Sequence, residues 1–367
     1  MSDLNFTSSE DLKRIVRGNT DKRITYILGA GASAGYSPGT KIKPPVVRDL
    51  FNRESNDLVH QVLNESRHKS VYTNREFFMK EVAESFDGDL EAFLSSLYKK
   101  NSDSKVFSNV LLYLQELFSE IGNHYVSNNN YSKLIQVTEA NLGKNWSVIS
   151  FNYDTLFEQA YKEVDMHPGK DFLSLPNYEL EPKLLKIHGS TNFYHIHDID
   201  TPHYQEMAVF SDDYLFKKMM SDGVSGSFPV LVSDIKPPSP IRAQRLNEKR
   251  DQRINTARYM SPLMLIPMHA ESVPSNSFFS KMVRKAVEEI SNADYVVAIG
   301  YNFGDDTFTS ALKKEEHSSK LILVGLESSR ENLMSSKGYE KVTEIWGKEN
   351  VSVLEADGFD GLIKAIY

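Results

Sequence analysis

Short apolar runs alternate with stretches of helical periodicity along most of the chain. The apolar runs are rich in β-branched and aromatic residues, and each ends at a glycine or a polar residue. They predict strands at 24–28, 146–150, 183–187, 263–267, 293–299, 320–324 and 351–355. Apolar residues at helical spacing predict helices between them, such as 278–291 and 305–314. Strands separated by helices predict an α/β fold, a Rossmann-like parallel sheet covered by helices.

Two segments interrupt this alternation. Residues of about 54–140 have amphipathic helical patterns and predict an inserted helical module. Residues of about 198–260 are polar, proline-containing and charge-rich, which predicts an irregular insertion with a solvated charged face. We therefore expect an N-terminal segment, 1–22, followed by one domain, 23–367, that carries both insertions.

The residues that follow the predicted strands are mostly glycine or polar. In open α/β sheets, ligands bind outside the carboxyl ends of the strands. The residues at these ends are Gly29-Ala30-Gly31, Asn152 with Asp154, His188-Gly189-Ser190, Gly300-Tyr301-Asn302 and Gly325-Leu326-Glu327. We expect them to converge on one site, because the carboxyl ends of parallel strands share one edge of the sheet.

The turn after the first of these strands is rich in glycine. Gly29, Gly31 and Gly35 come close to the dinucleotide-binding fingerprint, with one residue too many before the third glycine. Gly29 would permit a sharp turn, Gly31 would let a pyrophosphate approach backbone N–H groups, and Ser33 could donate a further hydrogen bond. The alternative is a small-residue turn in a fold without a nucleotide. Asp49 lies near the usual position of the ribose-binding acid but in a predicted helix, which argues against a standard dehydrogenase.

Three polar side chains are the main candidates for chemistry. Asn152 can both donate and accept hydrogen bonds, which suits a ribose hydroxyl or a water molecule. Its alternative role is in the turn, and the alternative for Asp154 is the N-cap of the next helix. His188 lies at a strand end, and its ordinary pKa near neutrality makes it the candidate general base. His195 and His197 are weaker candidates.

Composition narrows the class of protein. The chain has 367 residues and a net charge of −8, so no overall positive charge attracts nucleic acid or anionic membrane. It contains no cysteine, which excludes disulfides, thiolate nucleophiles and Cys-ligated zinc. No signal peptide is evident, and no stretch approaches the roughly 20 apolar residues that span a bilayer. We expect a soluble cytoplasmic protein.

Four ordered motifs resemble the sirtuin superfamily. They are Gly29–Ser33, Ser150–Asp154, Lys186–Ser190 and Gly300–Phe303. The chain departs from protein-deacylating sirtuins in lacking the four cysteines of their zinc module. It also has Tyr36–Lys41 where they carry a Pro-Asp-Phe-Arg motif. The chain more closely resembles the bacterial sirtuin-like NAD hydrolases of antiphage defence, which lack that module.

This resemblance implies a reaction and a set of site residues. NAD+ would be the substrate, cleaved to nicotinamide and ADP-ribose or cyclised at the same site, with no metal in this chain. Asn152 and His188 would be catalytic. The residues that would contact NAD+ are Gly29, Ala30, Gly31, Ala32, Ser33, Asp154, Ser190, Gly300, Tyr301, Gly325 and Glu327. Asp357 and Gly358 could complete the nucleotide pocket.

Unregulated hydrolysis of NAD+ would kill the host cell, so we expect control by homo-oligomerisation or by a partner. The resemblance suggests a HerA-like ATPase or a short Argonaute as that partner. Membrane binding and sequence-specific nucleic-acid binding are not expected. Two other functions stay open at this point. One is an NAD-dependent protein deacylase, and the other is a scaffold that binds NAD or ADP-ribose without turnover.

Overall fold

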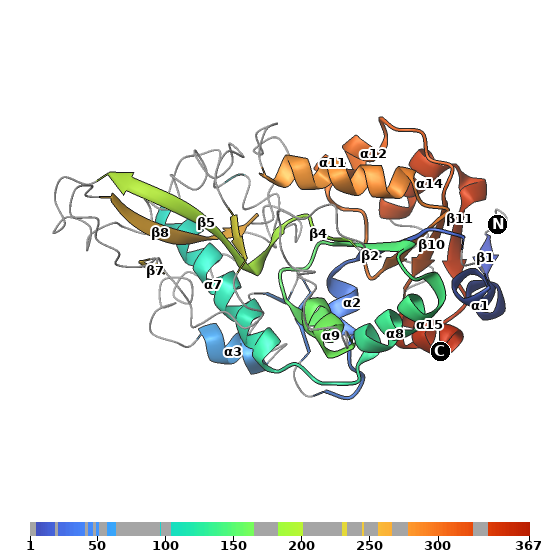
Figure 1. Ribbon diagram of the computed structural model, residues 1–367, viewed down its shortest axis with the longest axis horizontal. Helices are drawn as coiled ribbons and strands as arrows, with labels where there is room; N and C mark the ends of the chain where they lie inside the picture. The colour runs from blue at the N-terminus through green and yellow to red at the C-terminus, as the bar shows by residue number, and fades with distance from the viewer. Residues whose placement is uncertain are drawn as a thin grey trace.

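The computed structural model describes residues 5–18, 21–40, 43–46, 49–50, 57–63, 96, 104–164, 183–200, 230–232, 244–245, 256–265, 278–325 and 337–367. Figure 1 shows a central sheet between two layers of helices, with a smaller sheet extending from one end. The central sheet contains the predicted site, so its topology decides which residues can meet.

Seven parallel strands form the central sheet, in the order β1-β11-β10-β9-β2-β3-β4. They are β1 (Phe6–Thr7), β2 (Ile24–Leu28), β3 (Trp146–Ser150), β4 (Lys183–Lys186), β9 (Tyr295–Ile299), β10 (Lys320–Val324) and β11 (Val351–Leu354). The chain runs outward from β2 to β4 and then returns to β9 on the other side of β2. The strand order therefore reverses between β2 and β9, the kind of position where such sheets bind ligands. The predicted Rossmann-like parallel α/β fold is confirmed.

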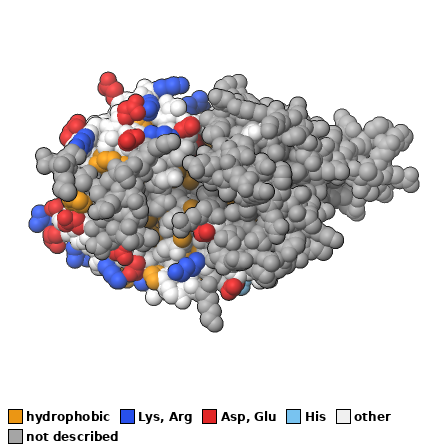
Figure 2. All heavy atoms as spheres, turned by 180° about the vertical axis from the view of Figure 1, so that it is seen from behind, with side chains coloured by type: hydrophobic (Ala, Val, Ile, Leu, Met, Phe, Trp, Pro, Cys, Tyr) orange, Lys and Arg blue, Asp and Glu red, His pale blue; other side chains and the backbone are white. Residues whose placement is uncertain are grey.

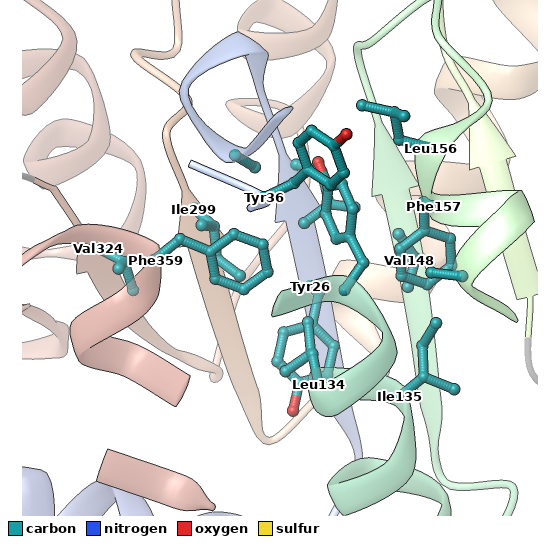
Figure 3. Packing of buried hydrophobic residues seen from close by; sticks show 14 of the residues in the cluster. Tyr26, Tyr36, Leu134, Ile135, Val148, Leu156, Phe157, Ile299, Val324 and Phe359 are labelled. Carbon is teal, nitrogen blue, oxygen red and sulfur yellow. The ribbon is translucent and has the colours of Figure 1, made fainter. Parts of the chain in front are cut away.

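Both faces of this sheet are buried under helices, as expected for parallel strands. Side chains along a strand alternate between the faces, so Tyr26 and Ile27 belong to different apolar clusters. One face is covered by α1 (Ser9–Arg17), α8 (Asn130–Leu142), α9 (Leu156–Val164) and α15 (Gly358–Ile366). The other is covered by α11 (Phe278–Ser291), α12 (Asp306–Leu312) and α14 (Lys337–Trp346). Figure 3 shows part of the first cluster, including Tyr26, Val148, Ile299, Leu134, Phe157 and Phe359.

Side-chain caps fix where several helices begin. The side chains of Ser8, Asn129 and Asp305 accept hydrogen bonds from backbone N–H groups three residues further along the chain. Each cap satisfies an N–H group that has no partner within its own helix. The cap at Asp305 is also part of the candidate site described below.

A second, antiparallel sheet has the order β6-β5-β8-β7. Its strands are β5 (Gly189–Asp200), β6 (Val230–Val232), β7 (Gln244–Arg245) and β8 (Thr256–Met264). The helix α7 (Ser104–Asn123) packs against both β5 and β8. Because β5 begins shortly after β4 ends, the chain passes directly from the central sheet into the second sheet.

Three segments named in the expected domain division have described secondary structure. The segment 1–22 supplies β1, which pairs with β11, and α1, which packs on α8 and α15. The block 54–140 includes α3 (Asp57–Leu63), α7 and most of α8, and α8 covers one face of the central sheet. The described parts of 198–260 belong to the second sheet. Residues 198–200 are the end of β5, β6 and β8 pair with β5, and β7 pairs with β8.

Two further features of the described residues are the hydropathy of their helices and the charge on their surface. Within the described residues, no helix is long and apolar enough to cross a membrane. On the described part of the face in Figure 2, acidic and basic side chains are intermixed. Neither observation identifies a partner.

The turn after β2 and the loop after β9 lie backbone against backbone. The N–H of Gly29 donates to the Ile299 carbonyl at 3.0 Å, and that of Gly31 donates to the Gly300 carbonyl at 3.1 Å. A Cβ on Gly29 would lie 2.4 Å from the Gly300 carbonyl oxygen. Gly300 has a φ of +59°, and its Cβ would lie 2.4 Å from the Ala32 nitrogen. The contact therefore requires glycine on both sides.

We predict that Gly300→Ala destabilises the fold strongly. The left-handed backbone and the overpacked contact together should lower the free energy of unfolding by about 2–5 kcal/mol. Gly39→Ala is the matched control, since Gly39 has a φ of +85° but nothing within 4 Å of its Cβ position. Urea denaturation at neutral pH measures both changes. Equal losses for the two variants would mean that the contact between the turns contributes nothing.

Candidate active site

The glycine turn after β2 leads into the short helix α2 (Ala30–Ala34). Gly29 has a φ of −108° and a ψ of −176°, an extended conformation open to any residue. Its small size is needed for the contact with Gly300, and not for a sharp turn as the sequence suggested. The N–H of Gly31 already donates to Gly300, so its expected contact with a pyrophosphate stays a prediction. Ala30 is partly exposed at the start of α2, while Ala32 is buried.

Ser33 is the centre of a buried polar network. Its Oγ accepts a hydrogen bond from Asn152 Nδ2 at 2.9 Å and donates one to Asp154 Oδ2 at 2.8 Å. The Tyr131 hydroxyl lies 3.0 Å from the same Oγ. A serine hydroxyl has one proton, so Tyr131 must be the donor in this last bond. The network joins α2, α8 and the loop after β3.

The orientation of the Asn152 amide follows from its partners. Nδ2 donates to the Gly29 carbonyl at 2.9 Å as well as to Ser33. A carbonyl oxygen can only accept, so the nitrogen end of the amide must face it. Both N–H groups are then used, while Oδ1 has no hydrogen-bond partner among the described residues. Asn152 is 8% exposed, and it presents this oxygen as a fixed acceptor.

Asp154 has two hydrogen-bonding tasks. Its Oδ1 accepts from the backbone N–H of Leu156 at 3.1 Å, at the start of α9. Its Oδ2 accepts from Ser33. One oxygen thus supports the start of the helix and the other belongs to the Ser33 network, while the expected contact of Asp154 with NAD+ stays a prediction. Asp154 is 3% exposed.

A buried lysine, not anticipated as a site residue, supports this loop. Lys186 lies on β4, and its Nζ donates to the Asp154 carbonyl at 2.6 Å. The same Nζ is 3.1 Å from Glu158 Oε1 on α9, and both side chains are almost fully buried. Burial raises the pKa of Glu158, and the charge of Lys186 only partly opposes this rise. The available signal in the sequence was a lysine at the end of a strand, directly after Leu184 and Leu185.

His188 lies at the junction of the two sheets. Gly189, the next residue, has a φ of +77°, a left-handed conformation that favours glycine. The Leu265 N–H donates to the His188 carbonyl at 2.8 Å, which ties the junction to the end of β8. The ring of Phe151 packs edge-on against the imidazole with ring centroids 5.2 Å apart. The backbone at this strand end is therefore held from both sheets.

The His188 imidazole is paired with Asp305, which the sequence reasoning also missed. Nε2 lies 2.7 Å from Asp305 Oδ2, and each side chain is 15% exposed. Burial alone would raise the pKa of Asp305. The hydrogen bond and charge of His188, with backbone N–H groups at the start of α12, outweigh burial and lower it. In the sequence, Asp305 looked only like the start of a helix.

The remaining residues that were predicted to contact NAD+ make contacts with other residues of the protein. The Tyr301 ring stacks on Phe151 with centroids 4.0 Å apart and an angle of 15°. Ser190 Oγ donates to the Tyr153 carbonyl at 3.2 Å. The Gly325 carbonyl accepts from the Gly358 N–H at 2.9 Å, which links β10 to α15. Glu327 lies outside the described residues.

Hydrogen bonds thus unite the glycine turn, Ser33, Asn152 and Asp154. No hydrogen bond joins Asn152 to His188, whose ring instead packs on Phe151, the neighbour of Asn152. A parallel, doubly covered sheet with these polar groups at its carboxyl edge defines a Rossmann-like α/β protein. No cluster of His, Asp and Glu within the described part of the chain could hold a metal ion.

Comparison with known proteins identifies the family. The SIR2-like domain profile matches residues 147–330, half of the chain, so the chain belongs to the SIR2-like domain family. A Sir2 homolog–NAD complex is similar with a TM-score of 0.43 and 10% identity, over 100% of this chain and 95% of that chain. A mutant Sir2 homologue in complex with ADP-ribose has a TM-score of 0.44 and 11% identity, over 97% and 94%. No curated protein sequence matches significantly.

We predict that Lys186→Met destabilises the protein by about 3–5 kcal/mol at neutral pH, because Glu158 would keep a buried charge without a partner. A raised pKa means that the folded state favours the protonated carboxyl, so ionising Glu158 costs stability as the pH rises through that pKa. The loss of stability caused by Lys186→Met should therefore become smaller as the pH falls toward 4.5, the ordinary pKa of a glutamate. Urea denaturation across this pH range measures it.

The double variant Lys186→Met/Glu158→Leu is the control for this pair. It removes both charges at similar volume, so most of the lost stability should return. The Asp154 carbonyl would still lack its donor, which leaves a deficit of about 1–3 kcal/mol. If the double variant were as unstable as the single one, the ion pair would not be the cause.

Proposed function

We propose that this chain is an NAD+ glycohydrolase that cleaves NAD+ to nicotinamide and ADP-ribose. The observation that carries the proposal is the Asn152 amide, locked by Gly29 and Ser33 with Oδ1 left as an acceptor. It lies at the same sheet edge as His188, whose imidazole ring can accept a proton. Membership of the SIR2-like domain family supports NAD+ as the substrate.

The protein does not have to protonate the leaving group in this reaction. The bond between the ribose C1′ and the pyridinium nitrogen breaks, and its electron pair returns to the ring, so nicotinamide leaves neutral without a general acid. The transition state resembles an oxocarbenium ion, as in other glycosidic cleavages. Water supplies the oxygen that bonds to C1′, and His188 accepts the proton that this water loses.

The other site residues bind and orient in this proposal. Asn152 Oδ1 accepts a hydrogen bond from a ribose hydroxyl or from the attacking water. Asp154 contributes negative charge beside the developing cation and holds Ser33 in place. The glycine turn and the strand-end residues Ser190, Gly300, Tyr301 and Gly325 contact the rest of NAD+, with Glu327 as a further contact.

We further propose that the activity depletes NAD+ in antiphage defence by abortive infection. Such an activity has to be held in check, which implies a homo-oligomer or a partner such as a HerA-like ATPase or a short Argonaute. The segments 54–140 and 198–260 are the surfaces where we expect that contact. A cytoplasmic location fits this role.

We predict that Asn152→Ala and His188→Ala each reduce nicotinamide release by about 10²–10⁴-fold or more, because each removes a group that acts on the reacting ribose or water. Chromatography of NAD+ incubations measures the products, ADP-ribose or its cyclic form. His124→Ala and Asn292→Ala are matched controls at exposed positions and should keep the wild-type rate. Thermal unfolding verifies that all four variants are folded.

Other outcomes would point to other functions. Wild-type rates in both site variants would place the active site elsewhere. Deacylation of a labelled acyl-peptide would favour a protein deacylase. Tight NAD+ binding without nicotinamide release, even with candidate partners present, would favour a scaffold. Full turnover by the isolated chain at low concentration would argue against control by a partner.

A further inference from the structure

Asp305 and His188 meet although they follow strands that are far apart in the sheet. Asp305 follows β9 and His188 follows β4, with β2 and β3 between them. Neighbouring strands lie about 4.8 Å apart, so these two strand ends are separated by roughly 14 Å. The loop 300–305 must cross the carboxyl edge of the sheet to bring the Asp305 carboxylate within 2.7 Å of the imidazole.

Backbone conformation and side-chain packing hold this loop in one shape. Gly300 and Phe303 both have left-handed backbones, with φ values of +59° and +56°. For a bulky residue such as Phe303 this conformation costs on the order of 1–3 kcal/mol, and it persists only where packing enforces it. The Phe303 ring is 2% exposed and packs against Tyr301 and Trp346, with centroids 4.9 Å and 6.0 Å away. The loop is held in the shape that places Asp305.

The Asp305 carboxylate itself is fixed from two directions. Oδ1 accepts from the Phe308 N–H at 2.8 Å and caps α12, which leaves Oδ2 for His188. The lowered pKa of Asp305 makes it an anion at neutral pH, and an anion can only accept a hydrogen bond. His188 Nε2 must therefore donate. The Nδ1 atom of His188 has no hydrogen-bond partner among the described residues.

We propose that Asp305 is a positioning residue that keeps the Nε2 proton of His188 in place, so that Nδ1 is the atom that acts as the base of the site. The inference rests on the proposed NAD+ hydrolysis and names the atom that removes the proton. Nδ1 takes the proton from the attacking water as its oxygen bonds to C1′ and nicotinamide departs. The resulting imidazolium is stabilised by the Asp305 carboxylate and later releases its proton to solvent.

Asp305→Asn tests this arrangement. Its Oδ1 can still cap α12, since asparagine caps as well as aspartate does. Its amide nitrogen can only donate toward Nε2, so the imidazole proton must move to Nδ1 and the base is lost. We expect kcat for nicotinamide release to fall by about 10²–10⁴-fold. The KM for NAD+ should stay close to that of the wild type, because Asp305 does not contact the substrate in this proposal.

Two further variants separate positioning from folding. Asp305→Ser keeps a helix cap but offers the imidazole no carboxylate, so it should also lose kcat while unfolding like the wild type. Asp306→Asn is the matched control, because Asp306 is exposed and pairs with Lys341 on the surface. It should keep the wild-type rate. A wild-type kcat in Asp305→Asn, or an equal loss in Asp306→Asn, would overturn the proposal.

A spectroscopic readout makes the inference independent of activity. In full-length protein labelled with ¹⁵N-histidine, His188→Gln identifies the His188 signals by their loss. With the pH raised until the His188 ring carries a single proton, the wild type should show a protonated Nε2 and an unprotonated Nδ1, and Asp305→Asn should show the reverse. The same tautomer in both proteins would overturn the positioning role. If the wild type released no nicotinamide while the tautomer reversed as expected, NAD+ hydrolysis would fail and the pairing would stand.

Discussion

The contact between the turn after β2 and the loop after β9 is the constraint on which the rest of the site depends. These two strands are neighbours at the point where the strand order reverses, and their backbones touch through Gly29, Gly31 and Gly300. Because no side chain separates them, α2 begins close to the sheet, with Ser33 buried. The same contact fixes the first residue of the loop that ends at Asp305. One packing arrangement therefore places both halves of the site.

The hydrogen bonds around Ser33 make this buried network a rigid unit. Every donor and acceptor that Ser33 offers is used, and both N–H groups of Asn152 are used. A buried network that is fully satisfied stabilises one arrangement, since any rotation would leave a polar group without a partner. Lys186 adds a bond from β4 to the same loop. What is left unused is the Asn152 carbonyl oxygen, and this makes it the group best suited to meet a substrate.

The sequence was most informative for strands that are buried on both faces of the sheet. Strands such as Ile24–Leu28 and Trp146–Ser150 are buried on both faces, so a short β-branched run identified them with the correct bounds. Polar residues at their ends located Ser33, Asn152, Asp154 and His188 as candidates. The pairings among these residues could not be read from the sequence. They depend on strand order, which decides that a loop following β9 reaches the end of β4, and no local pattern carries that information.

The two halves of the site have different supports, and this bears on how the proposed activity could be controlled. Ser33 lies on α2 beside the central sheet. The loop that carries Asn152 and Asp154 follows β3, and its Tyr153 carbonyl accepts hydrogen bonds from the Thr191 N–H at 3.0 Å and from Ser190 Oγ at 3.2 Å, both on β5. His188 also belongs to the second sheet, because β5 starts beside it and Leu265 binds its carbonyl. A displacement of β5 and β8 would therefore act directly on the imidazole and its bond to Asp305, and through Tyr153 on the loop that carries Asn152. A partner or a second copy that bound the second sheet would in this way act on the proposed proton transfer without contacting the glycine turn, which makes the junction at His188 the part of the fold best suited to the proposed regulation.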